Sequence, residues 1–422
     1  MQLFLNGLTA TKLLDQIICY LFLILFIWGA NIKFGKKNQF NDDHASLDAM
    51  KSLRGFAAIG VILHHISQED IFQQKAVFSA FVNAGAYFVA IFFFCSGFGL
   101  IKSLNTKENY LKGFIKNRIV KAIVLPFYVN VIVYGILMAV TGYELPKERW
   151  IFNFLGLTMM NTYAWFPIVL ALLYLVFFLC FRFIKKRPVC FAVIFLFIIG
   201  LGGLFSWNGH FAPWHGPENW WLNPFYNQRE WWQYDMTLWF SGEWWVNSAP
   251  AFLAGLIFAN YEKQITGFFK KAYALKFHVL LIITMIFYKL SAFGQMKFGY
   301  WTEYNGNGAG MAEKFKTYLC QVPLFLVLGF TIIIFMMKYH VSNPVSRFFG
   351  KYSLHTYLMN LACITGCQFI QKIKFPAKVG NLNLLLYGAA VIALTVALGV
   401  GEYWLTEAIK KLLFRKKKAA TA

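Results

Sequence analysis

The stretch KSLRGFAAIGVILHH, residues 51–65, guides the interpretation of the rest of the chain. It opens with the cations Lys51 and Arg54, continues through uncharged residues, and closes with His64 and His65. On an α-helix, residues eleven apart differ in direction by only about 20°, and they lie about 16 Å apart along the axis. The spacing therefore predicts a helix that carries Arg54 and His65 on one face, whereas His64 points about 80° away from Arg54.

The composition places this helix in a membrane. Of the 422 residues, 59% are hydrophobic and only 14% are charged, whereas soluble globular chains carry about 25% charged residues. The net charge of +22 comes from short basic clusters between apolar runs, so we expect membrane topology rather than nucleic acid to explain it. The seven cysteines show neither the paired spacing of a zinc site nor a disulfide framework, and we expect no metal.

Runs of about 18–25 apolar residues, the length of a membrane-spanning helix, recur along the whole chain. We expect an all-α fold, a polytopic transmembrane helix bundle of about 10–11 membrane-spanning helices. The predicted spans are 14–32, 51–68, 78–101, 119–141, 163–184, 189–206, 241–261, 276–293, 317–337, 347–370 and 382–408.

Lysine and arginine are unevenly divided between alternate loops. The loops on one predicted side hold 28 of the 40 basic residues, and the richer side is expected to be cytoplasmic. We therefore place the N-terminus outside and the basic tail, 409–422, in the cytoplasm. We expect residues 1–45 to form an extra N-terminal helix and a cytoplasmic linker. Residues 46–408 are expected to form the membrane domain, in which residues 207–240 are an aromatic-rich outer loop.

This orientation places Arg54 at the cytoplasmic surface and His65 at or slightly beyond the middle of the bilayer. An ionisable group at that depth is costly and should face the bundle interior or a wet cavity. Because desolvation disfavours the imidazolium ion, we expect His65 to be uncharged and able to accept a proton. The alternative is a histidine that forms a hydrogen bond between helices and serves only packing.

Aromatic side chains concentrate near the outer loop, since nine of the fourteen tryptophans lie between residues 207 and 245. An aromatic belt at the membrane interface is one interpretation. A platform on which a sugar ring stacks is the other, and the two are compatible. Glu243, Trp244 and Trp232 are the candidates for binding such a substrate, although a glutamate at the interface can also be simply solvated.

Several segments, in order along the chain, resemble the membrane acyltransferase-3 family. SLRGFAAIGVILHH fits the first core helix of that family, in which a basic residue is followed, after ten others, by histidine, here Arg54 and His65. FFFCSGFGL resembles the FF-x-x-SGF segment, and YLKGFIKNRIVKAIVLPFY resembles the basic loop and third helix. YAWFPIVLALLYLVFFL, APAFLAGLIFA and FFGKYSLHTYLMN resemble later helices, so that the resemblance covers most of residues 46–405.

Three positions depart from the pattern of the family. Lys51 stands where many members have aspartate, and Lys121 replaces the second arginine of the Arg-x-x-Arg pair that begins at Arg118. Asn360 stands where the family has a late histidine. We expect this last change to weaken a role for the late motif, but not for His65.

The resemblance implies an O-acyltransferase that moves an acyl group, usually acetyl, from cytosolic acyl-CoA to a hydroxyl of an envelope carbohydrate or glycoconjugate. We expect His65 to act as general base on that hydroxyl and Ser96 to be a polar donor near the reacting carbonyl. Arg54, Arg118 and Lys121 are the candidates for binding the phosphates of acyl-CoA. No tightly bound cofactor is expected, since acyl-CoA is a co-substrate, and the expected location is the bacterial cytoplasmic membrane.

Other functions stay open at this point. A transporter or flippase for a lipid-linked sugar would also need many spans, buried polar groups and an aromatic outer vestibule. The inverted repeats and broken helix pairs that are typical of transporters are not evident in the sequence. A degenerate family member that serves as a receptor or scaffold is a third possibility, prompted by Lys121 and Asn360.

Overall fold

The computed structural model describes residues 10–36, 38–73, 78–140, 151, 161–209, 245–299, 311–374 and 381–414. Within these residues the longer helices are α2 (Ala10–Ile27), α3 (Leu47–Ser67), α5 (Gly85–Thr106), η2 (Ile115–Val124), α6 (Leu125–Val140), α8 (Trp165–Phe183), α9 (Arg187–Gly209), α12 (Pro250–Asn260), α13 (Glu262–Lys270), α14 (Tyr273–Phe298), α15 (Met311–Met336), α16 (Pro344–Lys374) and α17 (Asn381–Leu413). The short elements are α4 (Asp70–Gln73), η1 (Ser79–Phe81), η3 (Thr162–Ala164), β1 (Ala30–Ile32) and β2 (Tyr339–Val341).

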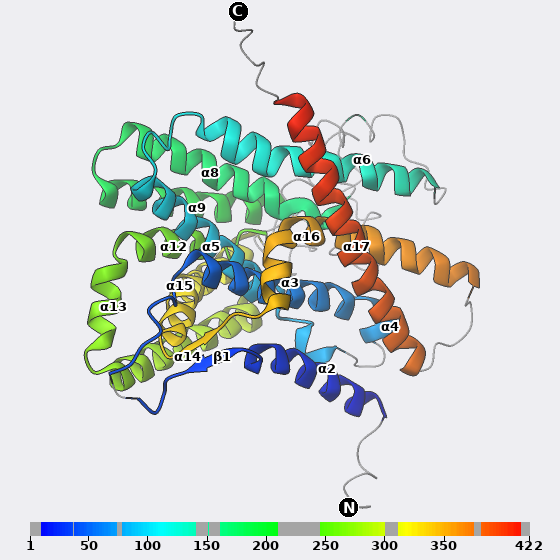
Figure 1. Cartoon of the computed structure of the whole chain (residues 1–422), viewed down its shortest axis with the longest axis horizontal. Coiled ribbons are helices and arrows are strands. Elements are labelled where there is room, and N and C mark those ends of the chain that lie inside the picture. Colours follow the sequence, from blue (N-terminus) through cyan, green and yellow to red (C-terminus); the bar gives the residue numbers. More distant parts are fainter. Residues whose placement is uncertain are drawn as a thin grey trace, which may run out of the picture.

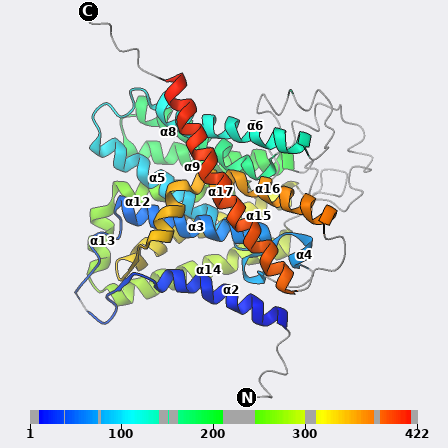
Figure 2. The same cartoon turned by 45° about the vertical axis from the view of Figure 1, so that its right-hand side comes forward.

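The predicted all-α architecture is confirmed. Each of the eleven predicted runs overlaps a helix. In the described part of the chain, seven helical segments are long and apolar enough to cross a membrane, namely α5, η2 with α6, α8, α9, α14, α15 and α17. Figure 1 shows α3, α6, α8 and α14 running in roughly the same direction, and Figures 1 and 2 both show α17 crossing the bundle obliquely.

Two predicted spans differ from the observed helices at their ends. The first was expected to continue to residue 32, but α2 ends at Ile27, and Gly29 turns the chain with a φ of +74°. Residues 30–32 then pair as β1 with β2 in an antiparallel sheet. Within the span predicted at 241–261, α12 begins at Pro250, since proline fits the first turn of a helix, and residues 241–244 lie outside the described part of the chain.

Glycines bring α3 and α5 close to their neighbours. A Cβ atom added at Gly97 in α5 would overlap the backbone of Phe252 in α12, and one added at Gly255 would overlap the backbone of Phe94. Gly55 in α3 faces the backbone of Ser346 in α16 in the same way. Small residues at helix crossings are typical of membrane bundles because they let backbones touch. These glycines thus allow close contact of α5 with α12 and of α3 with α16.

Candidate functional site

His65 is held by a side chain that lies 295 positions further along the chain. It is only 6% exposed, and its Nδ1 atom lies 2.8 Å from Oδ1 of Asn360 in α16. Nδ2 of Asn360 in turn donates to Oγ1 of Thr395 in α17, at 3.1 Å. Because an amide oxygen can only accept, Nδ1 of His65 donates the hydrogen, which leaves the lone pair on Nε2.

Aromatic rings fix the plane of this imidazole. The ring of Tyr163 in η3 stacks on His65 with centroids 3.7 Å apart and an interplanar angle of 19°. Tyr357 of α16 lies against it at 5.9 Å. Among the residues that the structure describes, Nε2 of His65 has no hydrogen-bond partner. The histidine site, defined here as His65, Asn360, Thr395 and Tyr163, therefore presents an acceptor nitrogen in a fixed orientation.

The neighbouring His64 has a different environment. Its Nδ1 lies 2.9 Å from the carbonyl oxygen of Phe81 in η1, and Gly85 leaves room for its ring. Its ring centroid is still 5.4 Å from that of His65. The prediction that His64 points away from the Arg54–His65 face agrees with these contacts.

Arg54 is linked through Tyr174 to polar groups of two further helices. Its Nε atom is shielded from solvent and has no hydrogen-bond partner in the described part of the chain. The hydroxyl of Tyr174 in α8 is close enough to interact with Arg54, with Ser96 of α5 and with Arg118 of η2. We call these four residues the arginine cluster. Three of them were predicted from sequence. Tyr174 was not a candidate, although a tyrosine within an apolar helix is a signal that could have indicated it.

Two tyrosines show that Arg54 and His65 face the same neighbour. Tyr163 contacts His65 and Tyr174 lies near Arg54, so α8 with its preceding turn runs antiparallel to α3. Each pair is separated by eleven residues, which corresponds to about 16 Å along a helix. The predicted common face is therefore observed. Ser96 lies toward the Arg54 end of α3, since it interacts with Tyr174 and the adjacent Cys95 contacts Met50, one turn before Arg54.

A pocket of about 360 Å³ adjoins the arginine cluster. It is lined by Lys107, Tyr110, Phe114, Asn117 and Arg118. Arg118 donates from Nη2 to Oγ of Ser103 at 3.3 Å, and its guanidinium carbon lies 5.4 Å from the centre of the Tyr110 ring. Burial raises the pKa of Tyr110, and the charge of Arg118 partly opposes that shift. A guanidinium in such a pocket suits a phosphate, since it can donate two parallel hydrogen bonds.

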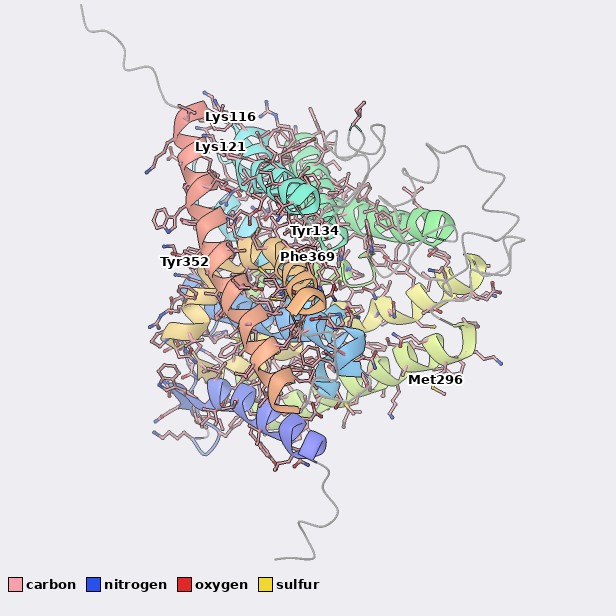
Figure 3. All side chains as sticks on the ribbon, turned by 90° about the vertical axis from the view of Figure 1, so that its right-hand side faces the viewer. Lys116, Lys121, Tyr134, Met296, Tyr352 and Phe369 are labelled. Carbon is pink, nitrogen blue, oxygen red and sulfur yellow. The ribbon has the colours of Figure 1, made fainter. Side chains whose placement is uncertain are left out.

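Lys121 does not lie in the arginine cluster. Its Nζ atom lies 4.7 Å from the ring centre of Phe414, at the end of α17, and Nζ of Lys116 lies 5.4 Å from the same ring. Figure 3 shows both lysines beside this end of α17. Arg118 and Lys121 are three residues apart in η2, which is a π-helix. Because a π-helix has wider turns than an α-helix, two such residues point in more different directions than they would on an α-helix. The role of Lys121 in binding acyl-CoA stays a prediction.

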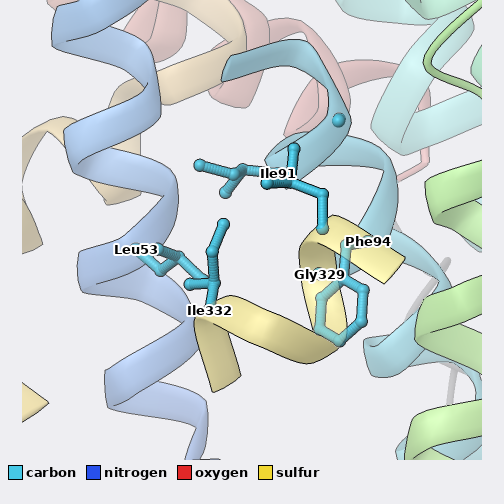
Figure 4. A pocket seen from close by; sticks show the side chains of 7 residues that line it. Leu53, Ile91, Phe94, Gly329 and Ile332 are labelled. Atoms are coloured by element: carbon cyan, nitrogen blue, oxygen red, sulfur yellow. The ribbon is translucent and has the colours of Figure 1, made fainter. Parts of the chain in front are cut away.

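Other candidates fall elsewhere. Glu243, Trp244 and Trp232 lie outside the described residues. In the described part of the chain, no group of three or more histidine, cysteine, aspartate or glutamate side chains could hold a metal ion. A small pocket of about 10 Å³, shown in Figure 4, lies between α3, α5 and α15, and Leu53, Ile91 and Ile332 help to line it. It is apolar and too small for a substrate.

The comparisons with known proteins now add to this geometry. The family model described as an acyltransferase domain, that of the acyltransferase-3 family, matches residues 47–402. This range includes the whole histidine site and the whole arginine cluster. Neither the curated proteins nor the solved structures give a match. The apolar helices and this family indicate an integral membrane protein. The chain belongs to the acyltransferase-3 family, and its general class is that of an acyltransferase.

Proposed function

We propose that this protein is an integral-membrane O-acyltransferase of the bacterial cytoplasmic membrane. It moves an acyl group, which we expect to be acetyl, from cytosolic acyl-CoA to a hydroxyl of an envelope carbohydrate or glycoconjugate. The observation that carries the proposal is the hydrogen bond of His65 to Asn360, because it leaves Nε2 as an acceptor within the bundle.

In the proposed step, Nε2 of His65 takes the proton of the acceptor hydroxyl while the hydroxyl oxygen attacks the thioester carbonyl. The bond between carbonyl carbon and sulfur then breaks, and the coenzyme A thiolate leaves. The proton passes from His65 to that thiolate, so the histidine returns to its uncharged form. General-base assistance of this kind is worth about 10²–10⁴ in rate.

The arginine cluster supports the binding of the donor. Coenzyme A carries several phosphates, and Arg54 and Arg118 are fixed cations on one side of the bundle. The separation of about 16 Å between Arg54 and His65 along α3 is one that an extended pantetheine arm can bridge. We therefore propose that Ser96 and Tyr174 contact the donor arm, because they lie at the Arg54 end and not beside the reacting carbonyl.

The test is to incubate the purified protein with acetyl-CoA that carries a radiolabelled acetyl group, and to add an envelope glycan fraction. An acyltransferase releases free coenzyme A and moves the label to the glycan, where mass spectrometry detects the added acyl mass. A transporter or flippase leaves the thioester intact. If acetyl-CoA is not consumed with any glycan fraction from cells that contain the protein, the proposed function is wrong.

A further inference from the structure

A second and larger pocket lies apart from the arginine cluster and the histidine site, and shares no lining residue with them. It has a volume of about 560 Å³ and opens where the loop before α3 meets the end of α13. The lining residues are Lys33, Asn38, Gln39, Phe40, Asp42, Lys270 and Lys271. Three ammonium groups and one carboxylate therefore face this pocket, together with two side-chain amides.

The lysines of this pocket are only partly engaged. Nζ of Lys33 donates to the carbonyl oxygen of Phe40 at 2.8 Å, and Nζ of Lys270 lies 3.7 Å from the carboxylate of Asp42. The Asp42 side chain is 92% exposed, so this ion pair is weak. Within the described residues, Lys271 has no ion-pair partner. The pocket carries a positive excess that an anion can neutralise.

A buried lysine braces the wall of the pocket. Nζ of Lys338 donates to the carbonyl oxygens of Lys36 at 2.6 Å and of Gln39 at 2.7 Å. It also lies 4.2 Å from the centre of the Phe40 ring. Burial, and after it the charge of Lys33, lowers the pKa of Lys338 from its ordinary value. The loop that forms the wall is thus held in place by a group that adds to the local positive potential.

The helix beside the pocket has the character of a membrane-surface helix. Figures 1 and 2 both show α13 running across the end of the bundle. No residue of α13 is buried in the protein. Ile265 and Phe269 pack against the main hydrophobic core, whereas Phe268 is 58% exposed. A short surface helix that exposes an aromatic side chain near lysines is typical of the interface between headgroups and acyl chains.

We propose that this pocket binds the phosphate headgroup of an anionic phospholipid in the adjoining leaflet, which we predict to be the cytoplasmic one. The headgroup phosphate takes the place between Lys270, Lys271 and Lys33. The acyl chains of the lipid run beside Phe268 and the exposed start of α14, where Leu275 is 69% exposed. This inference does not depend on acyl transfer, since it concerns a separate site and is measured without turnover.

The test uses the full-length protein in detergent, with short-chain phosphatidylglycerol as the probe and native mass spectrometry as the measurement. Phosphatidylcholine with the same chains is the uncharged comparison. The double variant Lys270→Gln/Lys271→Gln should weaken phosphatidylglycerol binding about 25-fold, since each lysine near a lipid surface is worth about fivefold. Asp42→Asn should strengthen it a few-fold, because it removes the one carboxylate of the pocket.

The matched control is Lys185→Gln/Lys186→Gln, which removes two adjacent exposed lysines from the loop between α8 and α9 without touching the pocket. It should leave binding within about twofold of the unaltered protein. Equal binding of the two lipids, or an equal loss in the control, would overturn the proposal. Displacement of the lipid by equimolar inorganic phosphate or coenzyme A would also overturn it, because the pocket would then bind a soluble phosphate. An unchanged melting temperature shows that each variant is folded.

Discussion

Two buried histidines in this bundle have opposite kinds of partner. Nδ1 of His65 lies against the neutral amide of Asn360 at 2.8 Å, whereas Nδ1 of His355 lies 3.4 Å from the carboxylate of Glu402. The side chains of His355 and Glu402 are only 7% and 1% exposed. An amide that accepts a hydrogen bond selects the tautomer of the ring. Burial disfavours the charged forms of both His355 and Glu402. In the described part of the chain, Nδ1 of His355 and both carboxyl oxygens of Glu402 have no hydrogen-bond partner. Their contact therefore packs α16 against α17, whereas the hydrogen bond to Asn360 gives His65 a defined tautomer.

This difference gives the replacement of the family histidine by Asn360 a physical meaning. The amide is anchored by Thr395 and so keeps its oxygen toward His65. An asparagine cannot take up or release a proton, which leaves His65 as the titrating group of this pair. In the proposed reaction, Asn360 is therefore a positioning residue for His65.

The largest effect should come from removing the imidazole of His65. His65→Ala should lower the rate of acetyl transfer by about 10²–10⁴, because the acceptor hydroxyl then loses its base. The measurement is release of coenzyme A by the purified variant at saturating acetyl-CoA. His278→Ala is the matched control, since His278 is exposed on α14 and contacts only its own helix through Ala274. Unchanged turnover in His65→Ala would reject the assignment of the base.

The second largest effect should be that of Arg54 on the binding of the acyl donor, acetyl-CoA. Arg54→Ala should raise the KM for acetyl-CoA about 10–100-fold, since a hydrogen bond to a charged group contributes about 1.5–3 kcal/mol. The KM for the acceptor should change little. Arg347→Ala removes a more exposed arginine, near Asp48, and should leave both constants nearly unchanged. Equal changes in the two KM values for Arg54→Ala would show that the side chain serves folding and not donor binding.

Asn360 should have a smaller and more specific effect than His65 or Arg54. Asn360→Asp places a carboxylate against His65 and favours its protonated form, so the rising limb of the pH–rate profile should move to higher pH. Asn360→Leu should lower kcat about tenfold without that movement, because the tautomer is no longer selected. Identical pH profiles for the aspartate variant and the unaltered protein would remove Asn360 from the mechanism.

Replacing His355 should have the smallest effect on the rate of acetyl transfer. His355→Ala removes a buried ring between α16 and α17 and should lower the free energy of unfolding by about 1–3 kcal/mol. Thermal unfolding in detergent measures this loss. At low temperature the kcat for acetyl transfer should stay within about twofold. A kcat loss as large as that of His65→Ala, in a folded variant, would mean that both histidines take part in the reaction.

Local patterns were enough to predict the helices and the common face of Arg54 and His65. Apolar runs form helices here because the backbone must satisfy its own hydrogen bonds within a bilayer. The end of the first run could not be predicted, because residues 30–32 pair with β2, more than 300 positions away. The position of Lys121 could not be predicted either, since the residues around it in the sequence do not indicate a π-helix.

By itself, the sequence determined an all-helical membrane protein, its family resemblance, and a cation and an imidazole on one face of one helix. These properties depend on composition and on the period of a single helix. Only the tertiary structure decided that Asn360 and Tyr163 hold His65 and that Tyr174 lies within the electrostatic reach of Arg54 and Arg118. Such contacts join helices that are far apart in the chain, and they depend on how whole helices cross, which no local pattern encodes.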